Sequence, residues 1–94
     1  MRPVKLLDKT WVDLDSVVAV SEVLAMQGNQ WIGLSEARHN ATYPNHTYAV
    51  QLTQHFRDKP FEIQWDDWGR YPSIEAHFDA QQAVGDRIVS LWRS

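Results

Sequence analysis

The 94-residue chain contains no cysteine, which excludes disulfide bonds, thiolate catalysis and cysteine-rich zinc sites. It has no apolar run long enough to cross a bilayer, and no apolar stretch follows residues 1–5 as a secretory signal would require. A cytoplasmic location without a membrane partner is therefore expected. Four glycines are dispersed along the chain, so no glycine-rich loop is available to hold a phosphate.

The chain also lacks an excess of positive charge. Nine Lys and Arg residues are outnumbered by twelve Asp and Glu residues, which gives a formal net charge of −3. The basic residues are scattered among acidic ones, whereas phosphate backbones are bound by clustered cations. Nucleic acid is therefore not the expected partner, and the acidic balance fits a basic protein surface better.

No motif for catalysis or metal binding is present. The serines lack the Gly-x-Ser-x-Gly pattern, and the four histidines have neither His-x-x-x-His nor His-Glu-x-x-His spacing. We predict no catalytic residue, no metal and no cofactor. An enzyme using His55 and His77 remains an alternative, if neighbouring strands bring the two rings together beside Glu62 or Asp66. Asp66 and Asp67 are adjacent on a predicted strand and point to opposite faces, which favours a solvated rim over a carboxylate pair.

What the chain does contain is a clear hairpin pattern over residues 47–68. Apolar and polar residues alternate along two segments, as is typical of strands with one dry and one wet face. Residues 57–60 form the turn, where Pro60 needs no ladder donor. The predicted dry-face residues are Tyr48, Val50, Leu52 and Phe56 in the first strand and Phe61, Ile63 and Trp65 in the second.

Three further segments precede this hairpin. Residues 4–12 predict a short hairpin that turns at Asp8 and Lys9. Residues 13–16 predict a turn or a single helical turn. Residues 17–26 are rich in valine with apolar residues on both faces, which favours a covered strand; a helix is the rival interpretation.

The remaining segments alternate between turns and regular structure. Residues 27–29 predict a hairpin turn that uses positive φ, and residues 30–35 predict a short strand. Residues 36–46 are polar and predict a long irregular loop of the kind that often carries function. Residues 73–78 alternate like a last strand.

One helix is expected, beginning at Asp79 as N-cap with Gln82 at capping-box spacing. Gly85 would let this helix approach the sheet closely. We predict an α+β fold with an antiparallel five- or six-stranded sheet, a meander, and one C-terminal α-helix packed on one face, in a single domain over residues 1–94. The apolar stripe of the helix comprises Ala80, Ala83, Val84, Ile88, Leu91 and Trp92.

Five tryptophans in 94 residues are several times the ordinary frequency. Trp65 and Trp92 fall on core positions by their periodicity, and we expect the same of Trp11. Aromatic rings at strand ends and near arginine are typical anchors of protein interfaces, although a small domain also uses large rings to fill its core. The predicted binding residues of this class are Trp31, Trp68, Arg70 and Tyr71.

The opening of the chain carries a resemblance. Residues 6–20 read LLDKTWVDLDSVVAV, a short hairpin, an Asp-x-Asp turn and a β-branched strand. This segment resembles the start of small phage and bacterial proteins and of FlbD-like flagellar proteins. The resemblance implies a small sheet with a terminal helix and fits a phage or prophage origin. It carries no flagellar function with it.

These observations favour a non-enzymatic protein that works through protein–protein contacts, for instance a phage-encoded inhibitor of a host or defence protein. A homo-oligomer is compatible with the same pattern. The alternative is a protein that binds a metabolite or nucleotide under a lid formed by the loop residues Arg38, His39, Tyr43 and His46.

Overall fold

The computed structural model describes residues 2–7, 10–41 and 44–94. Its centre is the predicted hairpin, in which β6 (Thr47–Gln54) and β7 (Phe61–Asp66) pair antiparallel from Thr47 opposite Asp66 to Leu52 opposite Phe61. The expected dry face is confirmed for β6 and β7, because Tyr48, Val50, Leu52 and Ile63 are fully buried. Phe56 was placed on that face wrongly, since it lies beyond the end of β6 and is exposed.

The valine-rich segment forms two strands, β3 (Val17–Val20) and β4 (Leu24–Gln27), which pair with the two ends of β6. The rival helix is therefore wrong. Between the strands, Ser21 continues the contact with β6, because its N–H donates to the Gln51 carbonyl and its Oγ accepts from the Gln51 N–H, both at 2.9 Å. The backbone groups of Gln51 are thus paired although β3 has ended.

A predicted tight turn joins β4 to β5 (Gln30–Gly33), with Gln27 paired to Gln30. Gly28 has a φ of 63°, a conformation that only glycine adopts without steric cost, so the turn prediction is confirmed. In the five-stranded sheet, β6 pairs with β3, β4 and β7, and β5 pairs with β4. The predicted meander is therefore wrong, because β3 and β4 pair with β6 rather than with each other.

The N-terminal residues form a separate two-stranded sheet of β1 (Pro3–Lys5) and β2 (Trp11–Asp13). The turn expected at Asp8 and Lys9 lies outside the described residues. A single 3-10 turn, η1 (Leu14–Ser16), follows β2, and the Asp13 side chain accepts a hydrogen bond from the Asp15 N–H at its start. Of the two interpretations of residues 13–16, a turn or a single helical turn, the helical turn is therefore the correct one.

The tryptophans divide between core and surface. Trp65 and Trp92 pack against the core, as predicted, and Trp92 donates its indole N–H to the Val17 carbonyl at 3.0 Å. Trp11 was expected in the core, but it is 65% exposed. In β2 the inward position belongs instead to Val12, and side chains on successive strand residues face opposite ways.

The segment predicted as an irregular loop at residues 36–46 contains a helix, α1 (Leu34–Asn40), so that prediction is wrong for its first half. Leu34 and Ala37 are buried one helical turn apart. The apolar pattern of this seven-residue helix therefore consists of only two positions. The Leu34 N–H donates to the Val23 carbonyl at 2.9 Å and joins the start of α1 to the segment before β4.

The C-terminal helix is longer than predicted. α2 (Ile74–Arg93) begins five residues before Asp79, so the strand expected at residues 73–78 is wrong. Ser73 is the N-cap, and its Oγ accepts from the Ala76 N–H at 3.0 Å. Alternation in residues 73–78 suggested a strand, but His77 and Phe78 are both buried, which a helix on a core allows and a one-sided strand does not.

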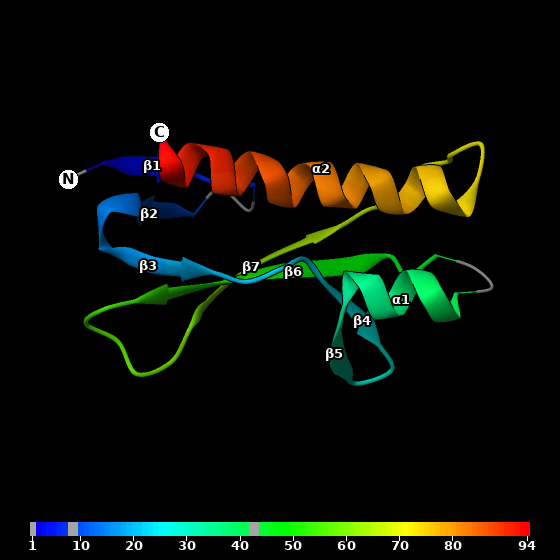
Figure 1. The fold of residues 1–94 in the computed structure, drawn as a ribbon, viewed down its shortest axis with the longest axis horizontal. Helices are drawn as coiled ribbons and strands as arrows, with labels where there is room; N and C mark the ends of the chain where they lie inside the picture. Colours follow the sequence, from blue (N-terminus) through cyan, green and yellow to red (C-terminus); the bar gives the residue numbers. More distant parts are fainter. Residues whose placement is uncertain (1, 8–9, 42–43) are drawn as a thin grey trace.

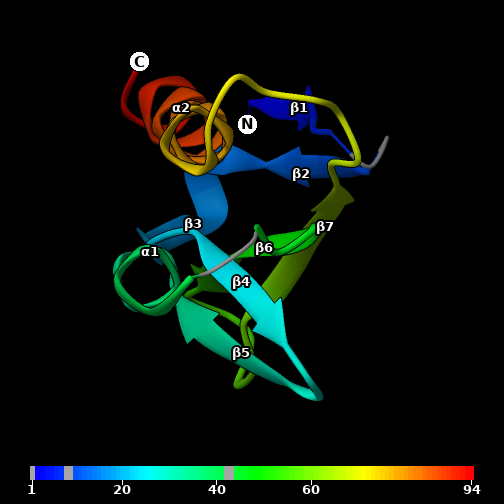
Figure 2. The same ribbon diagram turned by 90° about the vertical axis from the view of Figure 1, so that its right-hand side faces the viewer.

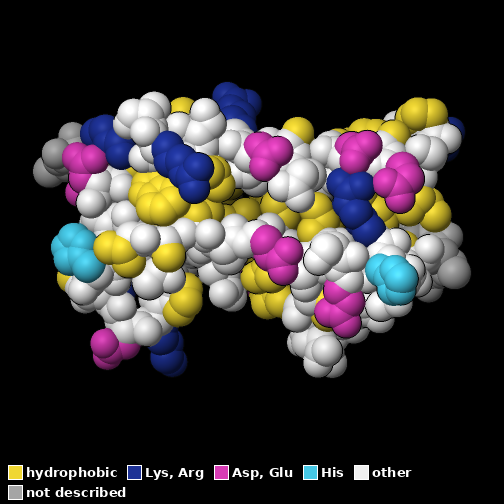
Figure 3. Space-filling model, viewed as in Figure 1, with side chains coloured by type: hydrophobic (Ala, Val, Ile, Leu, Met, Phe, Trp, Pro, Cys, Tyr) yellow, Lys and Arg dark blue, Asp and Glu magenta, His cyan; other side chains and the backbone are white. Residues whose placement is uncertain are grey.

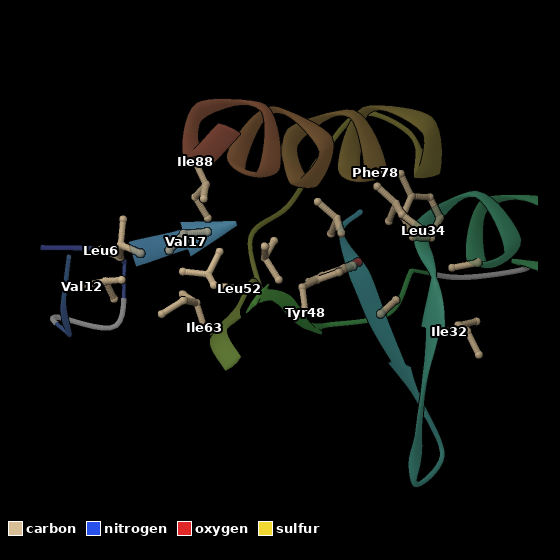
Figure 4. Packing of buried hydrophobic residues seen from close by; sticks show 14 of the residues in the cluster. Leu6, Val12, Val17, Ile32, Leu34, Tyr48, Leu52, Ile63, Phe78 and Ile88 are labelled. Carbon is tan, nitrogen blue, oxygen red and sulfur yellow. The ribbon is translucent and has the colours of Figure 1, made fainter. Parts of the chain in front are cut away.

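The α+β fold class and the helix across one face of the sheet are confirmed (Figures 1 and 2). Figure 4 shows Phe78 and Ile88 of α2 pointing toward Tyr48, Leu52 and the other buried residues of the strand layer. Burial of these apolar side chains is the main stabilising contribution to a fold of this size.

Gly85 allows the close approach of α2 that its position predicts. A Cβ atom at residue 85 would lie 2.4 Å from Cγ2 of Val23, which is closer than two non-bonded carbon atoms approach in real proteins. Both residues are buried. The helix therefore rests on the segment before β4 at a distance that only glycine permits.

Arg2 fixes the end of α2, and the two ends of the chain lie at the same side of the molecule (Figure 1). Its guanidinium donates to the carbonyls of Leu91 at 3.3 Å, Trp92 at 2.9 Å and Ser94, and its Nε donates to Asp15 at 2.6 Å. A cation at this position complements the negative end of the helix dipole and pairs carbonyls that the helix leaves open. Within the described part of the chain, no helix is long and apolar enough to span a membrane.

Candidate binding site

The site begins where the β6–β7 ladder ends. The Asp67 N–H donates to the His46 carbonyl at 2.8 Å, which extends the pairing by one step beyond both strands. The indole of Trp68 then stacks on the imidazole of His46, with centroids 3.9 Å apart and planes at 16°. His46 Nδ1 lies 2.9 Å from the Asp67 carbonyl, to which it donates as the N–H tautomer. Trp68 is held in place although 72% of its surface is exposed.

Tyr71 and His77 form the second half of the site. The two rings meet edge to face, with centroids 4.9 Å apart and planes at 75°. His77 is only 2% exposed, and its Nε2 donates to the Asn45 carbonyl at 3.1 Å. The hydroxyl of Tyr48 donates to the same carbonyl. The His46 ring lies 5.8 Å from His77, so the rings form one continuous group.

Asp67 is the polar centre of this group. Its Oδ2 accepts from the Tyr71 hydroxyl at 2.6 Å and from Gln81 Nε2 at 2.7 Å, and its Oδ1 accepts from the Gly69 N–H at 2.8 Å. Gln81 is buried in α2, and its Oε1 accepts from the Trp65 indole N–H at 2.7 Å. One chain of hydrogen bonds therefore joins β7, α2 and the segment after β7.

The protonation of the site follows from these contacts. Desolvation by itself would raise the pKa of Asp67, but the hydrogen bonds from Tyr71, Gln81 and the Gly69 amide outweigh it, so the pKa lies below its ordinary value of 3.8. The bond to Asp67 raises the pKa of the Tyr71 phenol. Burial, followed by the charge of Asp67, raises the pKa of Tyr48. Asp67 is thus an anion and both phenols are neutral at physiological pH.

A shallow pocket of about 190 Å³ opens beside these rings at the start of α2. Its volume is below the roughly 300–1,000 Å³ typical of small-molecule sites. It is lined by Pro44, Gly69, Tyr71, Ser73, Ile74 and His77.

Three of the eight predicted binding residues meet here. His46 and Trp68 are stacked, and Tyr71 joins them through His77. Arg70 lies between Trp68 and Tyr71 in the chain and is exposed. These four belong to the segments that flank the paired ends of β6 and β7.

Of the other four, the three that the structure describes do not join them. Trp31 is opposite Met26 in the β4–β5 hairpin, and His39 is exposed on α1. Arg38 links the two helices, because it donates to Glu75 at 3.1 Å and to Asp79 at 2.9 Å. The described residues therefore do not form the predicted lid of Arg38, His39, Tyr43 and His46, since Arg38 is bound to α2. Tyr43 lies outside the described residues.

The sequence interpretation missed three members of the network. Asp67 was assigned to a solvated rim, yet its carboxylate accepts three hydrogen bonds. His77 was expected on the strand predicted at residues 73–78, which is wrong because His77 is buried in α2, while His55 is exposed just beyond β6. Gln81 lies outside the apolar stripe predicted for the helix, and its role becomes visible only in its hydrogen bonds to Trp65 and Asp67.

Among the residues that the structure describes, no group of three or more His, Asp or Glu side chains is placed to hold a metal ion. On the face drawn in Figure 3, basic side chains are separated by neutral and acidic ones. No family model, no curated protein and no solved structure matches this chain.

Proposed function

We propose that this protein acts by binding another protein through the aromatic surface formed by Trp68 and Tyr71. The observation that carries the proposal is the stack of Trp68 on His46 at 3.9 Å, in which a largely exposed indole is held in one orientation. Exposed large aromatic rings are the commonest anchors of protein interfaces.

The energetics favour such a use. A tryptophan buries about 150–250 Å² when it is covered, and about 25 cal/mol is gained per Å² of apolar surface removed from water. With 72% of Trp68 exposed, covering it would contribute about 3–4 kcal/mol to binding. Immobilising a mobile side chain on binding costs about 0.5–1.5 kcal/mol of conformational entropy. Because Trp68 is already ordered by its stack on His46, part of this loss does not arise on binding.

The surroundings of the aromatic surface favour a protein over a small ligand. The adjacent pocket is small and open, so it would enclose only a fragment of a metabolite. The chain has a net charge of −3, and Asp66 is exposed two residues before Trp68. A partner with a basic surface and an apolar recess for the indole would fit this pattern.

Replacement of one indole at a time tests the proposal. Trp11→Ala is the matched control for Trp68→Ala, because Trp11 is 65% exposed on β2, toward the other end of the molecule (Figure 1). Immobilised wild-type protein is used to capture a partner from extract of the source cells, and the affinity of the purified partner is then measured for each variant.

We expect Trp68→Ala to weaken binding by about 2–4 kcal/mol, the range of interface hot spots, while Trp11→Ala binds like the wild type. Both variants should keep the wild-type melting temperature within a few degrees. Equal affinity of the Trp68→Ala variant and the wild type would overturn the proposal, and a large fall in melting temperature would assign Trp68 to the fold instead.

A further inference from the structure

The strand β7 leaves one side of its backbone unpaired. Among the described residues it pairs only with β6, and Figure 2 shows it on the side of β6 away from β3. The bond from the Asp67 N–H to the His46 carbonyl sets the phase of the ladder. Hydrogen-bonded pairs alternate in an antiparallel ladder, so residues 61, 63 and 65 turn their backbone groups toward β6. Glu62, Gln64 and Asp66 turn theirs outward.

The side chains of these three residues share one face of the sheet. Gln64 and Asp66 are exposed, Glu62 is half-buried, and Gln64 donates to Glu62 at 3.0 Å. No ion pair to Glu62 or Asp66 is formed within the described ranges. The open edge therefore presents an acidic, a neutral and an acidic side chain in a row.

This charge pattern decides between two occupants. If a second copy paired antiparallel about Gln64, Glu62 of each chain would lie opposite Asp66 of the other, and like charges directly opposite are destabilising. A strand with basic side chains four positions apart would place opposite charges across from both carboxylates. On the other face, its apolar side chains would cover Phe61 and Trp65, which are only half-buried.

We propose that the partner adds an extended segment to β7 as a further strand, with Lys or Arg at positions i and i+4 and apolar residues at positions i+1 and i+3. This inference rests on the protein-binding function proposed above and names the class of its partner. Backbone hydrogen bonds to Glu62, Gln64 and Asp66 supply the register, as in other cases of strand addition. Such a segment ends beside Trp68, two residues beyond the edge, where the exposed indole covers its last residues.

A synthetic peptide tests the geometry without the native partner. The probe is the capped peptide Val-Lys-Val-Thr-Val-Lys-Val, whose palindromic pattern fits β7 in either direction. Its control has Glu in place of both Lys. Binding is followed by amide N–H correlation spectra of the whole chain, titrated into the millimolar range. We expect shifts at residues 61–68 and an affinity for the basic probe on the order of tenfold above that for the acidic control.

Two variants at one residue separate backbone pairing from folding. Gln64→Pro removes an N–H that points outward, so the ladder with β6 is kept. Gln64→Ala removes the same side chain and keeps the N–H. We expect Gln64→Pro to lose at least about tenfold in probe affinity and Gln64→Ala to bind like the wild type. The double variant Glu62→Lys with Asp66→Lys should prefer the acidic control peptide.

The inference is overturned if the basic probe does not bind, or if it binds Gln64→Pro as well as Gln64→Ala. A wild-type dimer in sedimentation equilibrium that Gln64→Pro dissociates would assign the edge to a second copy and overturn it as well. A captured partner that is lost by Trp68→Ala but kept by Gln64→Pro would leave the protein-binding function standing and reject strand addition.

Discussion

The indole of Trp68 lies parallel to the imidazole of His46, with the ring centroids 3.9 Å apart. The two residues are far apart in sequence, and they meet because the backbone bond from Asp67 to His46 continues the β6–β7 ladder by one step. The pairing of two strands therefore orients a ring that the sequence places just outside them. An exposed tryptophan becomes a fixed feature of the surface in this way.

Removing the imidazole should release the indole without unfolding the protein. In His46→Ala, we expect the heteronuclear NOE of the Trp68 indole N–H to fall, because the ring loses its stacking partner. The melting temperature should fall by only a few degrees, since an aromatic pair contributes about 0.5–1.5 kcal/mol and this one is largely exposed.

His46→Phe is the matched control for this prediction. It keeps an aromatic ring below Trp68 and removes only the hydrogen bond to the Asp67 carbonyl. The NOE of the Trp68 indole should therefore stay near the wild-type value. An unchanged NOE in His46→Ala would show that the stack does not order Trp68.

The lowered pKa of Asp67 predicts a change of stability with pH. A carboxyl group whose pKa is depressed by folding stabilises the native state above its unfolded pKa, and this contribution is lost as the pH falls through the folded pKa. The ordinary value is 3.8, so the stabilisation from Asp67 should be complete near neutral pH and should decline below about pH 4. Urea unfolding of the wild type and of Asp67→Asn across this range measures it.

The expected result is a difference in unfolding free energy between the two proteins that is constant near neutral pH and narrows in acid. Asp66→Asn serves as the control, because the adjacent carboxyl group accepts none of the hydrogen bonds from Tyr71, Gln81 or the Gly69 amide. Its difference from the wild type should not narrow in the same way. A constant difference for Asp67→Asn down to pH 2 would contradict the lowered pKa.

The contact between Gly85 and Val23 predicts an unusual effect of alanine in a helix. Alanine favours the helix over glycine by about 1 kcal/mol, but its Cβ would lie 2.4 Å from Val23 Cγ2. Overpacking of a buried β-branched side chain costs about 1–3 kcal/mol, so Gly85→Ala should be destabilising or at best neutral. Chemical denaturation measures the free energy of unfolding.

Val23→Ala supplies the test of the cause. In that background the extra methyl group of Gly85→Ala has room, so the second substitution should raise the stability. Ala83→Gly, at an exposed position of the same helix, measures the intrinsic helix preference of alanine over glycine alone. It should lower the free energy of unfolding by about 1 kcal/mol. If Gly85→Ala stabilises the protein by the same amount in both backgrounds, the close contact has no energetic role.

The sequence alone determined those elements in which the apolar residues follow a single spacing, either that of a strand or that of a helix. Two patterns were sufficient to predict their elements: the alternation of Tyr48, Val50 and Leu52 for β6, and the helical stripe that ends at Trp92 for α2. Each pattern gathers its apolar residues on one face in only one conformation. Residues 73–78 fit both periods, and the helix forms there because His77 and Phe78 both find places in the core. α1 was missed since its apolar pattern consists of two positions, Leu34 and Ala37, within a polar segment.

The candidate site was predicted from the sequence only in part. The surplus of aromatic residues at strand ends led to the prediction of Trp68 and Tyr71, which lie in one group of rings, but the same signal also selected Trp31, which lies in the β4–β5 hairpin. The roles of Asp67, Gln81 and His77 were decided by the tertiary structure alone, since each has its partners on another element. Their hydrogen bonds exist only because α2 crosses the paired ends of β6 and β7, and no local pattern in a sequence records where two elements cross.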